Sequence, residues 1–257
     1  MRWLALTLIL LAGVSLAVNA AAYAAWRQAQ RRAPEGALVP PAFLPAFLAE
    51  WVACLLWLLA RPWRLRRRPP VGDAARGTLV LVPEARASAA SFWWLRRRLA
   101  RAGWDSVAAP GAGAAADLDA AAAALDAWLH RLPPSAAPLV LIGHGVGGLV
   151  AQRCAQRAGA VTVRRVVTLG SPHQGSSALP YRMLGVGATA PTTPATAAAT
   201  VDLIAIYSEF DAWLRPLENA YCPGAFNIAI HGVGHCATLL SPRVAALVVE
   251  NLAAPHP

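Results

Sequence analysis

The segment from residue 139 to residue 157 constrains the fold most, because it predicts a strand, a tight turn and a helix in immediate succession. An apolar run, Leu-Val-Leu-Ile, leads into the glycine-rich turn Gly143-His-Gly-Val-Gly-Gly148, and a helical pattern follows. Small flanking residues such as Gly143 and Gly147 allow a strand and a helix to approach closely. The segment is therefore expected to place Gly145 at the sharpest point of a strand–turn–helix connection.

Short apolar strands alternate with helical patterns through most of the remaining chain. The predicted strands cover residues 78–82, 104–108, 139–142, 165–169, 201–207 and 226–230. The predicted helices cover residues 91–102, 115–132, 148–157 and 242–252. Continuously apolar strands separated by helices are typical of a doubly wound α/β fold, a mostly parallel sheet covered on both faces. Ligands of such folds bind at the carboxyl ends of the strands, where Gly145 falls.

The N-terminal residues have the composition of a membrane anchor. Of the 257 residues, 57% are hydrophobic, which is more than an ordinary soluble enzyme contains. Residues 3–25 carry no charge and are long enough to cross a hydrocarbon core of ~30 Å. We expect an uncleaved anchor here. The alternative is a signal peptide, with a small-residue cleavage site at residues 18–20.

A second apolar run, residues 41–60, contains Pro45 and Glu50 and predicts a weaker span. It is either a second membrane helix or an interfacial helix with Glu50 among the lipid headgroups. Five arginines follow within residues 61–68, and the positive-inside rule then places the globular part in the cytoplasm, at a bacterial inner membrane. The expected organisation is an anchor over residues 1–68, a linker over 69–77 and an α/β domain over 78–257.

The formal net charge is +10, and all of the positive charge is arginine. Much of it flanks the apolar runs, so we assign it to membrane topology and expect membrane lipid, not nucleic acid, as a partner. The four cysteines have no C-x-x-C spacing, which argues against zinc and thioredoxin-like motifs. We expect no metal and no cofactor. The sequence does not decide whether Cys222 and Cys236 form a disulfide.

Four motifs occur in an order that resembles the α/β-hydrolase fold, and within it the bacterial membrane-associated lipase- and esterase-like proteins. The resemblance covers roughly residues 76–252. The motifs are Leu95-Arg-Arg-Arg-Leu-Ala-Arg-Ala-Gly-Trp104, Gly143-His-Gly-Val-Gly-Gly148, Thr168-Leu-Gly-Ser-Pro-His-Gln-Gly-Ser176, and Tyr207-Ser-Glu-Phe-Asp211 with Gly232-Val-Gly-His235. The second motif resembles the nucleophile elbow G-x-S-x-G, in which serine occupies the third position. Here that position is Gly145, which has no oxygen to form an acyl-enzyme.

The resemblance also implies roles for an acid and a histidine. By their motifs, Asp211 corresponds to the catalytic acid and His235 to the general base, and the chain order of nucleophile, acid and histidine matches the family. The acid would fix the tautomer of the imidazole and stabilise its charged form. The alternatives are a solvated carboxylate and a histidine bonded only to backbone. His144 and His173 are expected to pack around the site, not to catalyse.

The chain departs from the family pattern again after the first strand. Relatives carry His-Gly there, and that loop supplies one N–H group of the oxyanion hole, whereas this chain has Pro83-Glu84. Proline has no N–H group, and Glu84 brings negative charge to the place where an oxyanion develops. We therefore expect a degraded hole in which Val146 alone donates.

Two functions follow from these residues. The first is a membrane-anchored pseudohydrolase that lacks the nucleophile and binds an apolar or acyl ligand, or a protein partner. The alternative is an active carboxylic-ester hydrolase that uses a water activated by His235 or a substitute nucleophile. The candidate substitutes are Ser88, Ser91, Ser171 and Cys236. The Ala/Thr/Pro-rich residues 188–200 are expected to form a degenerate lid.

Overall fold

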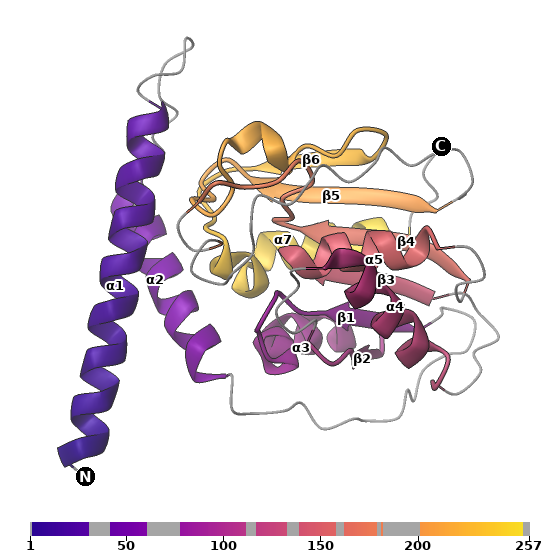
Figure 1. Ribbon diagram of the computed structural model, residues 1–257, viewed down its shortest axis with the longest axis horizontal. Coiled ribbons are helices and arrows are strands. Elements are labelled where there is room, and N and C mark those ends of the chain that lie inside the picture. The colour runs from indigo at the N-terminus through magenta and orange to yellow at the C-terminus, as the bar shows by residue number, and fades with distance from the viewer. Residues whose placement is uncertain are drawn as a thin grey trace.

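The centre of the protein is a sheet of parallel strands (Figure 1). The computed structural model describes residues 2–30, 42–60, 78–111, 117–132, 139–157, 162–178, 181 and 201–253. In this part of the chain the strand order is β2-β1-β3-β4-β5-β6, and every neighbouring pair is parallel. The strands are β1 Leu79–Val82, β2 Ser106–Ala108, β3 Leu139–His144, β4 Val163–Leu169, β5 Asp202–Ser208 and β6 Phe226–Ile230. The predicted parallel α/β sheet is confirmed.

Helices cover both faces of the sheet because its strands are apolar on both sides. In β1, Val80 and Val82 belong to the core cluster that contains residues of α4 and α5, whereas Leu79 and Leu81 belong to the cluster with α3 and α7. Successive side chains of a strand point to opposite faces, so a continuously apolar strand requires cover on both. The helices are α3 Trp93–Arg101, α4 Leu118–Leu129, α5 Val146–Ala155 and α7 Pro242–Ala253, with 3₁₀ turns η1 Ala89–Phe92, η2 Leu217–Ala220 and η3 Cys236–Leu240.

The predicted elements are found with small shifts at their ends. The helix expected over residues 91–102 begins only at Trp93, since Ser88 Oγ accepts the N–H of Ala90 at 3.2 Å and starts a 3₁₀ turn first. The helix expected over 115–132 begins after Asp117, whose carboxylate accepts two N–H groups of the first turn at 2.9 and 3.0 Å. Such side-chain acceptors satisfy N–H groups that have no partner within the helix.

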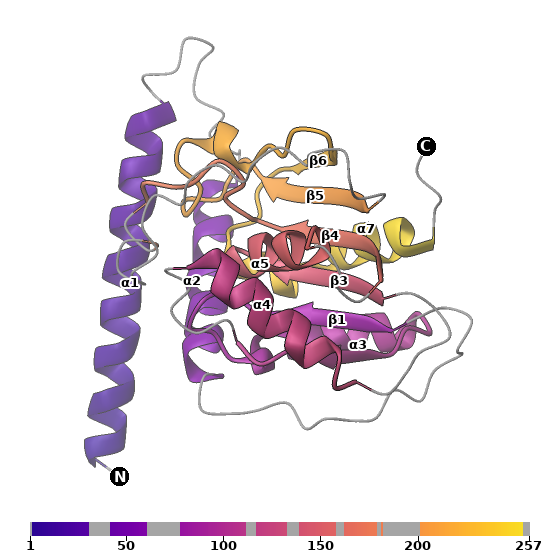
Figure 2. The same ribbon diagram turned by 45° about the vertical axis from the view of Figure 1, so that its right-hand side comes forward.

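Two N-terminal helices stand at one side of the sheet, with α2 (Phe43–Leu59) between α1 (Arg2–Gln30) and the α/β domain (Figures 1 and 2). The structure corrects the expected place of Glu50. Its side chain is not among headgroups but fully buried, and its carboxylate accepts the N–H groups of Cys236 and Ala237 at 2.9 and 2.8 Å. These N–H groups open the 3₁₀ turn η3 and favour the charged carboxylate, but burial outweighs them and raises the pKa of Glu50.

The C-terminal part of α1 is docked on the domain through aromatic residues. The Tyr23 hydroxyl donates to the carbonyl oxygen of Phe210 at 2.9 Å, and the two rings lie 4.7 Å apart. The N-terminal part of α1 exposes large apolar side chains: Trp3, Leu6, Ile9, Leu10, Leu11, Val14 and Leu16. Among the described helices, only α1 has the length and apolarity to cross a membrane, over Ile9–Gln30 with a mean hydropathy of 1.7. The arginine-rich run 61–68, the linker 69–77 and the expected lid 188–200 lie outside the described residues.

Candidate active site

Gly145 forms the sharp turn between β3 and α5. Its φ of +53° and ψ of −125° lie in a region that favours glycine. The neighbouring glycines are needed for space: a Cβ on Gly143 would lie 2.4 Å from the Cα of Gly148, and one on Gly147 would lie 2.3 Å from the carbonyl oxygen of Pro83. The close approach of strand and helix that the sequence predicts is therefore present, and the central position carries no side chain.

The structure brings Asp211 and His235 together. Asp211 lies in the turn that follows β5, and His235 lies between β6 and η3. The Nδ1 of His235 is 2.8 Å from Asp211 Oδ2, and both side chains are fully buried. The other carboxylate oxygen of Asp211 accepts the N–H of Trp213 at 2.8 Å. Asp211 and His235 thus form a buried carboxylate–imidazole pair, unlike the alternative of a solvated carboxylate and a histidine bonded only to backbone.

The third member of the site is Glu84, whose side chain reaches into the elbow from the end of β1. Its Oε1 accepts the N–H groups of Ala85 at 2.7 Å and Val146 at 3.0 Å. Its Oε2 lies 3.3 Å from His235 Nε2. A Cβ built on Gly145 would lie 1.5 Å from that same Oε2. The Glu84 carboxylate therefore occupies the space of the missing nucleophile side chain and also the position between two backbone donors.

This geometry differs from the degraded oxyanion hole expected from the sequence. Pro83 supplies no N–H group, as expected, but the N–H of Ala85 converges with that of Val146 on a single oxygen. Two converging backbone donors are the arrangement that stabilises an oxyanion. The sequence shows that Glu84 adds negative charge near the oxyanion hole. It does not show that the Glu84 side chain folds back to accept the N–H of Ala85. The hole has two donors and is filled by the protein's own carboxylate.

His235 is flanked by two carboxylates, and this sets its charge. Burial by itself lowers the pKa of its imidazole, but the charge and hydrogen bond of Asp211, together with those of Glu84, outweigh burial and raise the pKa to about 10. The ring is therefore an imidazolium at neutral pH. An imidazolium has no lone pair to accept a proton, so His235 in this state is not a general base.

Aromatic side chains enclose the charged group. The ring of Trp213 is stacked on His235 at 4.5 Å, and Tyr181 meets the edge of both. The Tyr181 hydroxyl donates to Glu84 Oε2 at 3.3 Å. On the outer side, Trp57 of α2 contacts Trp213 at a centroid distance of 6.3 Å. The site is thus continuous with the packing of the second N-terminal helix.

The other two histidines brace the site. His144 is fully buried, its ring lies 4.5 Å from that of His235, and its Nε2 is 3.0 Å from the carbonyl oxygen of His235. Burial lowers the pKa of His173 to about 4, and its ring nitrogens contact Thr168 Oγ1 at 3.0 Å and Gln152 Oε1 at 3.2 Å. These contacts tie the loop after β4 to α5. Both placements agree with packing roles.

The substitute nucleophiles considered from the sequence are not presented to His235. Both ring nitrogens of His235 already face carboxylates. The hydroxyl of Ser171 lies against Gly148, where a Cβ would meet it at 2.0 Å, and the thiol of Cys236 contacts Cys54 at 3.0 Å. Ser88 caps η1, and Ser91 lies in that same turn. The residue that takes the nucleophile's position is Glu84, which sequence reasoning assigned only to the oxyanion loop.

One group of side chains at the site has the composition of a metal ligand set. Glu84, His144 and His235 offer ligand atoms that lie within 4.8 Å of one another. However, the Nε2 of His235 faces the Glu84 carboxylate in an ion pair, and the raised pKa keeps a proton on this nitrogen. A metal ion binds the neutral imidazole, so it would have to displace that proton. The arrangement therefore fits a charged hydrogen-bonded triad better than a metal centre.

The chain was compared with protein-family models, curated protein sequences and solved structures. A family model described as a thioesterase domain matches residues 77–185, which include β1, the elbow and β4. A search of curated protein sequences found no match. Similar solved structures include the carboxylesterase CesB (YbfK) from Bacillus subtilis, with a TM-score of 0.55 and 15% identity over 83% of this chain and 99% of that chain.

Two further structures show the same likeness. Aspergillus fumigatus lipase B has a TM-score of 0.56 and 15% identity over 76% of this chain and 56% of its own. The type II thioesterase BorB from the borrelidin biosynthetic cluster has a TM-score of 0.53 and 18% identity over 74% and 95%. The chain is an α/β-hydrolase by fold. The family model and these structures make the chain similar to esterases, lipases and thioesterases within that fold.

Proposed function

We propose that this α/β-hydrolase is a membrane-attached pseudohydrolase, which keeps the esterase and thioesterase scaffold but does not hydrolyse esters. One observation carries the proposal: Glu84 Oε1 sits between the N–H groups of Ala85 and Val146, where the oxyanion of a reacting substrate would be held. A carboxylate fixed in that position excludes the substrate's carbonyl oxygen from it.

Three requirements of serine-type hydrolysis are not met. The nucleophile position, Gly145, has no oxygen, so no acyl-enzyme forms. His235 is protonated and has no capacity to take a proton from an attacking group. Loss of a single oxyanion donor typically costs about 10²–10³ in rate, and here both donors are bonded to Glu84. These losses act on the same transition state, so residual turnover is expected to be negligible.

Glu84 resembles the product of the reaction that the scaffold is built for. Hydrolysis of an ester or thioester releases a carboxylic acid, and its carboxylate would lie near the oxyanion donors and the imidazole. The Glu84 carboxylate makes those contacts from within the chain. Because it is tethered, it competes at a high effective concentration against any acid or ester from solution. The site therefore holds an internal product analogue.

The alternative function is ester hydrolysis with a non-standard nucleophile or an activated water. Glu84 Oε2 has the position that such a nucleophile needs, beside the imidazole of His235. Attack on a carbonyl carbon, however, requires an empty oxyanion hole for the substrate oxygen, and Oε1 of the same carboxylate fills it. Activation of water requires a neutral imidazole. Both points favour the pseudohydrolase.

The retained role that we infer is binding at a membrane. The exposed apolar side chains of α1 are continued on α2 by Leu44, Leu48, Val52, Leu56 and Leu59. Apolar surface of this extent supports attachment to membrane lipid. We further infer an acyl or lipid ligand, or a protein partner, for the domain, and a position on the cytoplasmic side of a bacterial inner membrane. The arginine bias around the two apolar runs supports that side.

Turnover and active-site labelling of the full-length protein in detergent test the proposal. Neither p-nitrophenyl esters nor acyl-coenzyme A thioesters of four to sixteen carbons should be hydrolysed above the rate of a His235→Ala variant. A fluorophosphonate probe should leave the protein unlabelled. Ordinary esterase turnover that disappears in His235→Ala would overturn the proposal and establish the alternative.

A further inference from the structure

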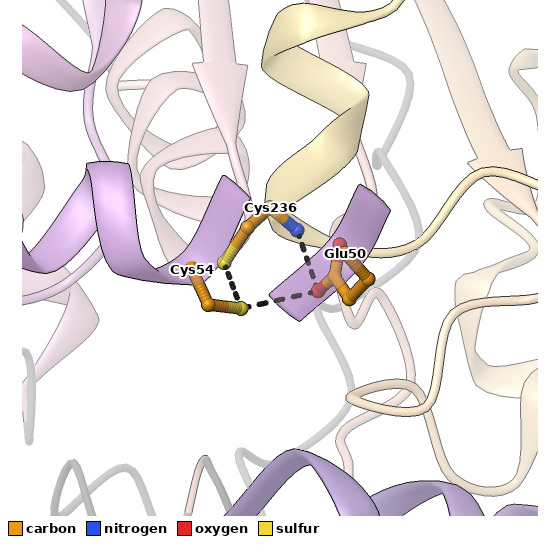
Figure 3. A group of neighbouring side chains, drawn as sticks. All are labelled: Glu50, Cys54 and Cys236. Carbon is orange, nitrogen blue, oxygen red and sulfur yellow. Dashed lines mark hydrogen bonds between the residues drawn. The ribbon is translucent and has the colours of Figure 1, made fainter. Parts of the chain in front are cut away.

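A second group of reactive side chains lies beside the charged triad of Glu84, His235 and Asp211, where α2 meets the turn after β6. It consists of Glu50 and Cys54 on α2 and Cys236 at the start of η3 (Figure 3). Glu50 and Cys54 are four residues apart, so they lie on the same face of the helix, one turn from each other. All three side chains are buried. The hydrolase site does not use them.

The two sulfur atoms are in direct contact. Cys54 Sγ lies 3.0 Å from Cys236 Sγ, although the residues are 182 positions apart in the chain. A disulfide requires a sulfur–sulfur distance of about 2.05 Å, so a closing movement of about 1 Å is enough. Two cysteines on a tetrahedral zinc ion, with Zn–S bonds of about 2.3 Å, would hold their sulfurs roughly 3.8 Å apart. The observed distance of 3.0 Å lies between these two values, so the sulfurs are in contact without a bond and closer together than two cysteine ligands of one zinc ion.

Glu50 is placed to accept a thiol proton. Its Oε1 lies 3.4 Å from Cys54 Sγ, and the same oxygen accepts the N–H of Cys236 at 2.9 Å. Thiol oxidation proceeds through the thiolate, and Glu50 is the acceptor for the proton that the thiol must lose. Burial, together with the charge of Glu50, raises the pKa of the Cys54 thiol to about 11. Burial raises the pKa of the Cys236 thiol well above its usual value. Cys54 is the thiol whose sulfur contacts the Glu50 carboxylate, so it is expected to lose its proton and react first.

A narrow cavity adjoins one cysteine of the pair, Cys236. Cys236 lines a narrow cavity together with Ala53, Trp57 and Ser91. The cavity has room for about one water-sized molecule, so hydrogen peroxide needs a small opening between α2 and η3, whereas a folded oxidoreductase would have to displace α2 to reach the sulfurs. The sulfur of Cys236 contacts that of Cys54, whereas the sulfur of Cys222 contacts Gln152, so Cys222 is not the sulfur neighbour of Cys236 that the sequence left possible.

We propose that Cys54 and Cys236 form a reversible disulfide that links α2 to the turn carrying His235. The Cys54 thiolate attacks hydrogen peroxide, which gives a sulfenic acid and, after protonation by Glu50, water. The Cys236 sulfur then attacks the Cys54 sulfur, the S–O bond breaks, and the hydroxide leaves with the Cys236 proton as a second water. Two thiols lose two electrons, and one peroxide gains them. A dithiol reductant reverses the reaction by thiol–disulfide exchange.

The bond would join the first and last parts of the fold. It would connect α2, the helix next to the membrane anchor, with Cys236, the residue that follows His235. The disulfide does not depend on whether the site hydrolyses esters. The linkage closes a loop of about 180 residues, and cross-links over loops of this length restrict the unfolded chain strongly. Oxidation is expected to raise the thermal unfolding midpoint by roughly 10 °C.

The experiment uses full-length protein purified in detergent with reductant, then desalted. One half is treated with hydrogen peroxide, both halves are unfolded and alkylated, and the protein is digested with chymotrypsin, which cleaves at Phe226 between Cys222 and Cys236. A cross-linked peptide pair containing Cys54 and Cys236, two daltons lighter than its reduced parts, is expected in the oxidised half only. Cys154 and Cys222 should be alkylated in both halves.

Variants separate this disulfide from other chemistry. Cys54→Ser should abolish the cross-link and the rise in midpoint, Glu50→Gln should slow oxidation at least tenfold, and Cys154→Ser, the matched control, should change neither. Alkylation of both Cys54 and Cys236 after peroxide treatment would overturn the proposal. So would pairing of Cys236 with Cys222, or stoichiometric zinc that protects both thiols from peroxide.

Discussion

Restoration of the nucleophile is the sharpest probe of the site, because the structure predicts that serine and Glu84 exclude each other. In Gly145→Ser the new Cβ would lie 1.5 Å from Glu84 Oε2 and 2.5 Å from its Cδ. The Glu84 side chain must therefore leave its position. It then loses its hydrogen bonds to the N–H groups of Ala85 and Val146 and its contact with His235.

The magnitude follows from these contacts. Hydrogen bonds to a charged group contribute about 1.5–3 kcal/mol each, and two are lost. A side chain at a φ of +53° adds backbone strain of roughly 1–3 kcal/mol. The free energy of unfolding of Gly145→Ser should thus fall by about 4 kcal/mol or more. That is a large part of the total stability of an ordinary domain, about 5–15 kcal/mol.

The double variant Gly145→Ser with Glu84→Gly should behave differently. Removal of the carboxylate eliminates the clash, empties both oxyanion donors and leaves His235 with one carboxylate neighbour, so its pKa falls toward the usual value. We expect the double variant to be more stable than Gly145→Ser and to react with a fluorophosphonate, whereas Gly145→Ser alone stays unlabelled. Glu84→Gly alone, which has no hydroxyl, is the control.

Urea unfolding followed by tryptophan fluorescence and gel detection of the fluorophosphonate measure the two effects. The reasoning predicts strong non-additivity between the positions, since the side chains compete for one space. It would be refuted if Gly145→Ser alone were labelled efficiently and as stable as the parent, because Glu84 would then not occupy the elbow. It would fail equally if the double variant were unlabelled although folded, because Asp211 and His235 would then not act as a dyad.

Three further predictions concern charge, packing and location. The pKa of His235 is about 10 in the folded protein and about 6.5 in the unfolded chain, so its contribution to the free energy of unfolding is complete below pH 6.5. This contribution is lost by about 1.4 kcal/mol per pH unit as the pH rises to 10. Urea titrations from pH 6 to 10 should show this slope, and Glu84→Gln should reduce it. Gly147→Ala should prevent folding or lower the melting temperature by more than 10 °C in a thermal scan, since its Cβ would meet the Pro83 carbonyl oxygen at 2.3 Å. Carbonate extraction should leave the full-length chain in the membrane pellet; a soluble mature form beginning near Ala21 would establish the signal-peptide alternative.

The sequence predicts the sheet and the elbow well, because both depend on local patterns. A continuously apolar run is visible at β1 and β3, and glycines at close approaches are visible in the turn itself. The acid and the histidine follow from motifs at the ends of late strands. Helix ends were less accurate, since caps such as Asp117 and Ser88 decide them residue by residue.

The contacts that define the charged triad were not predictable in the same way. The position of Glu84 depends on the torsions of a long side chain and on an N–H group of another element, that of Val146, 62 residues away. Burial of Glu50 depends on the turn at Cys236, far along the chain. Sequence patterns report which face of an element is apolar, but they do not report which distant backbone donors a carboxylate will meet.

The docking of α2 on the domain determines where an expressed fragment of the chain should begin. Trp57 and Cys54 of α2 belong to the same core cluster as the strands, and Glu50 satisfies two N–H groups of η3. A fragment that begins at residue 78 would expose that cluster to water and leave these donors without their acceptor. The helix that composition assigns to the membrane is, by its contacts, the last layer of the domain. Soluble expression trials should therefore begin upstream of Phe43, so that α2 is retained whole.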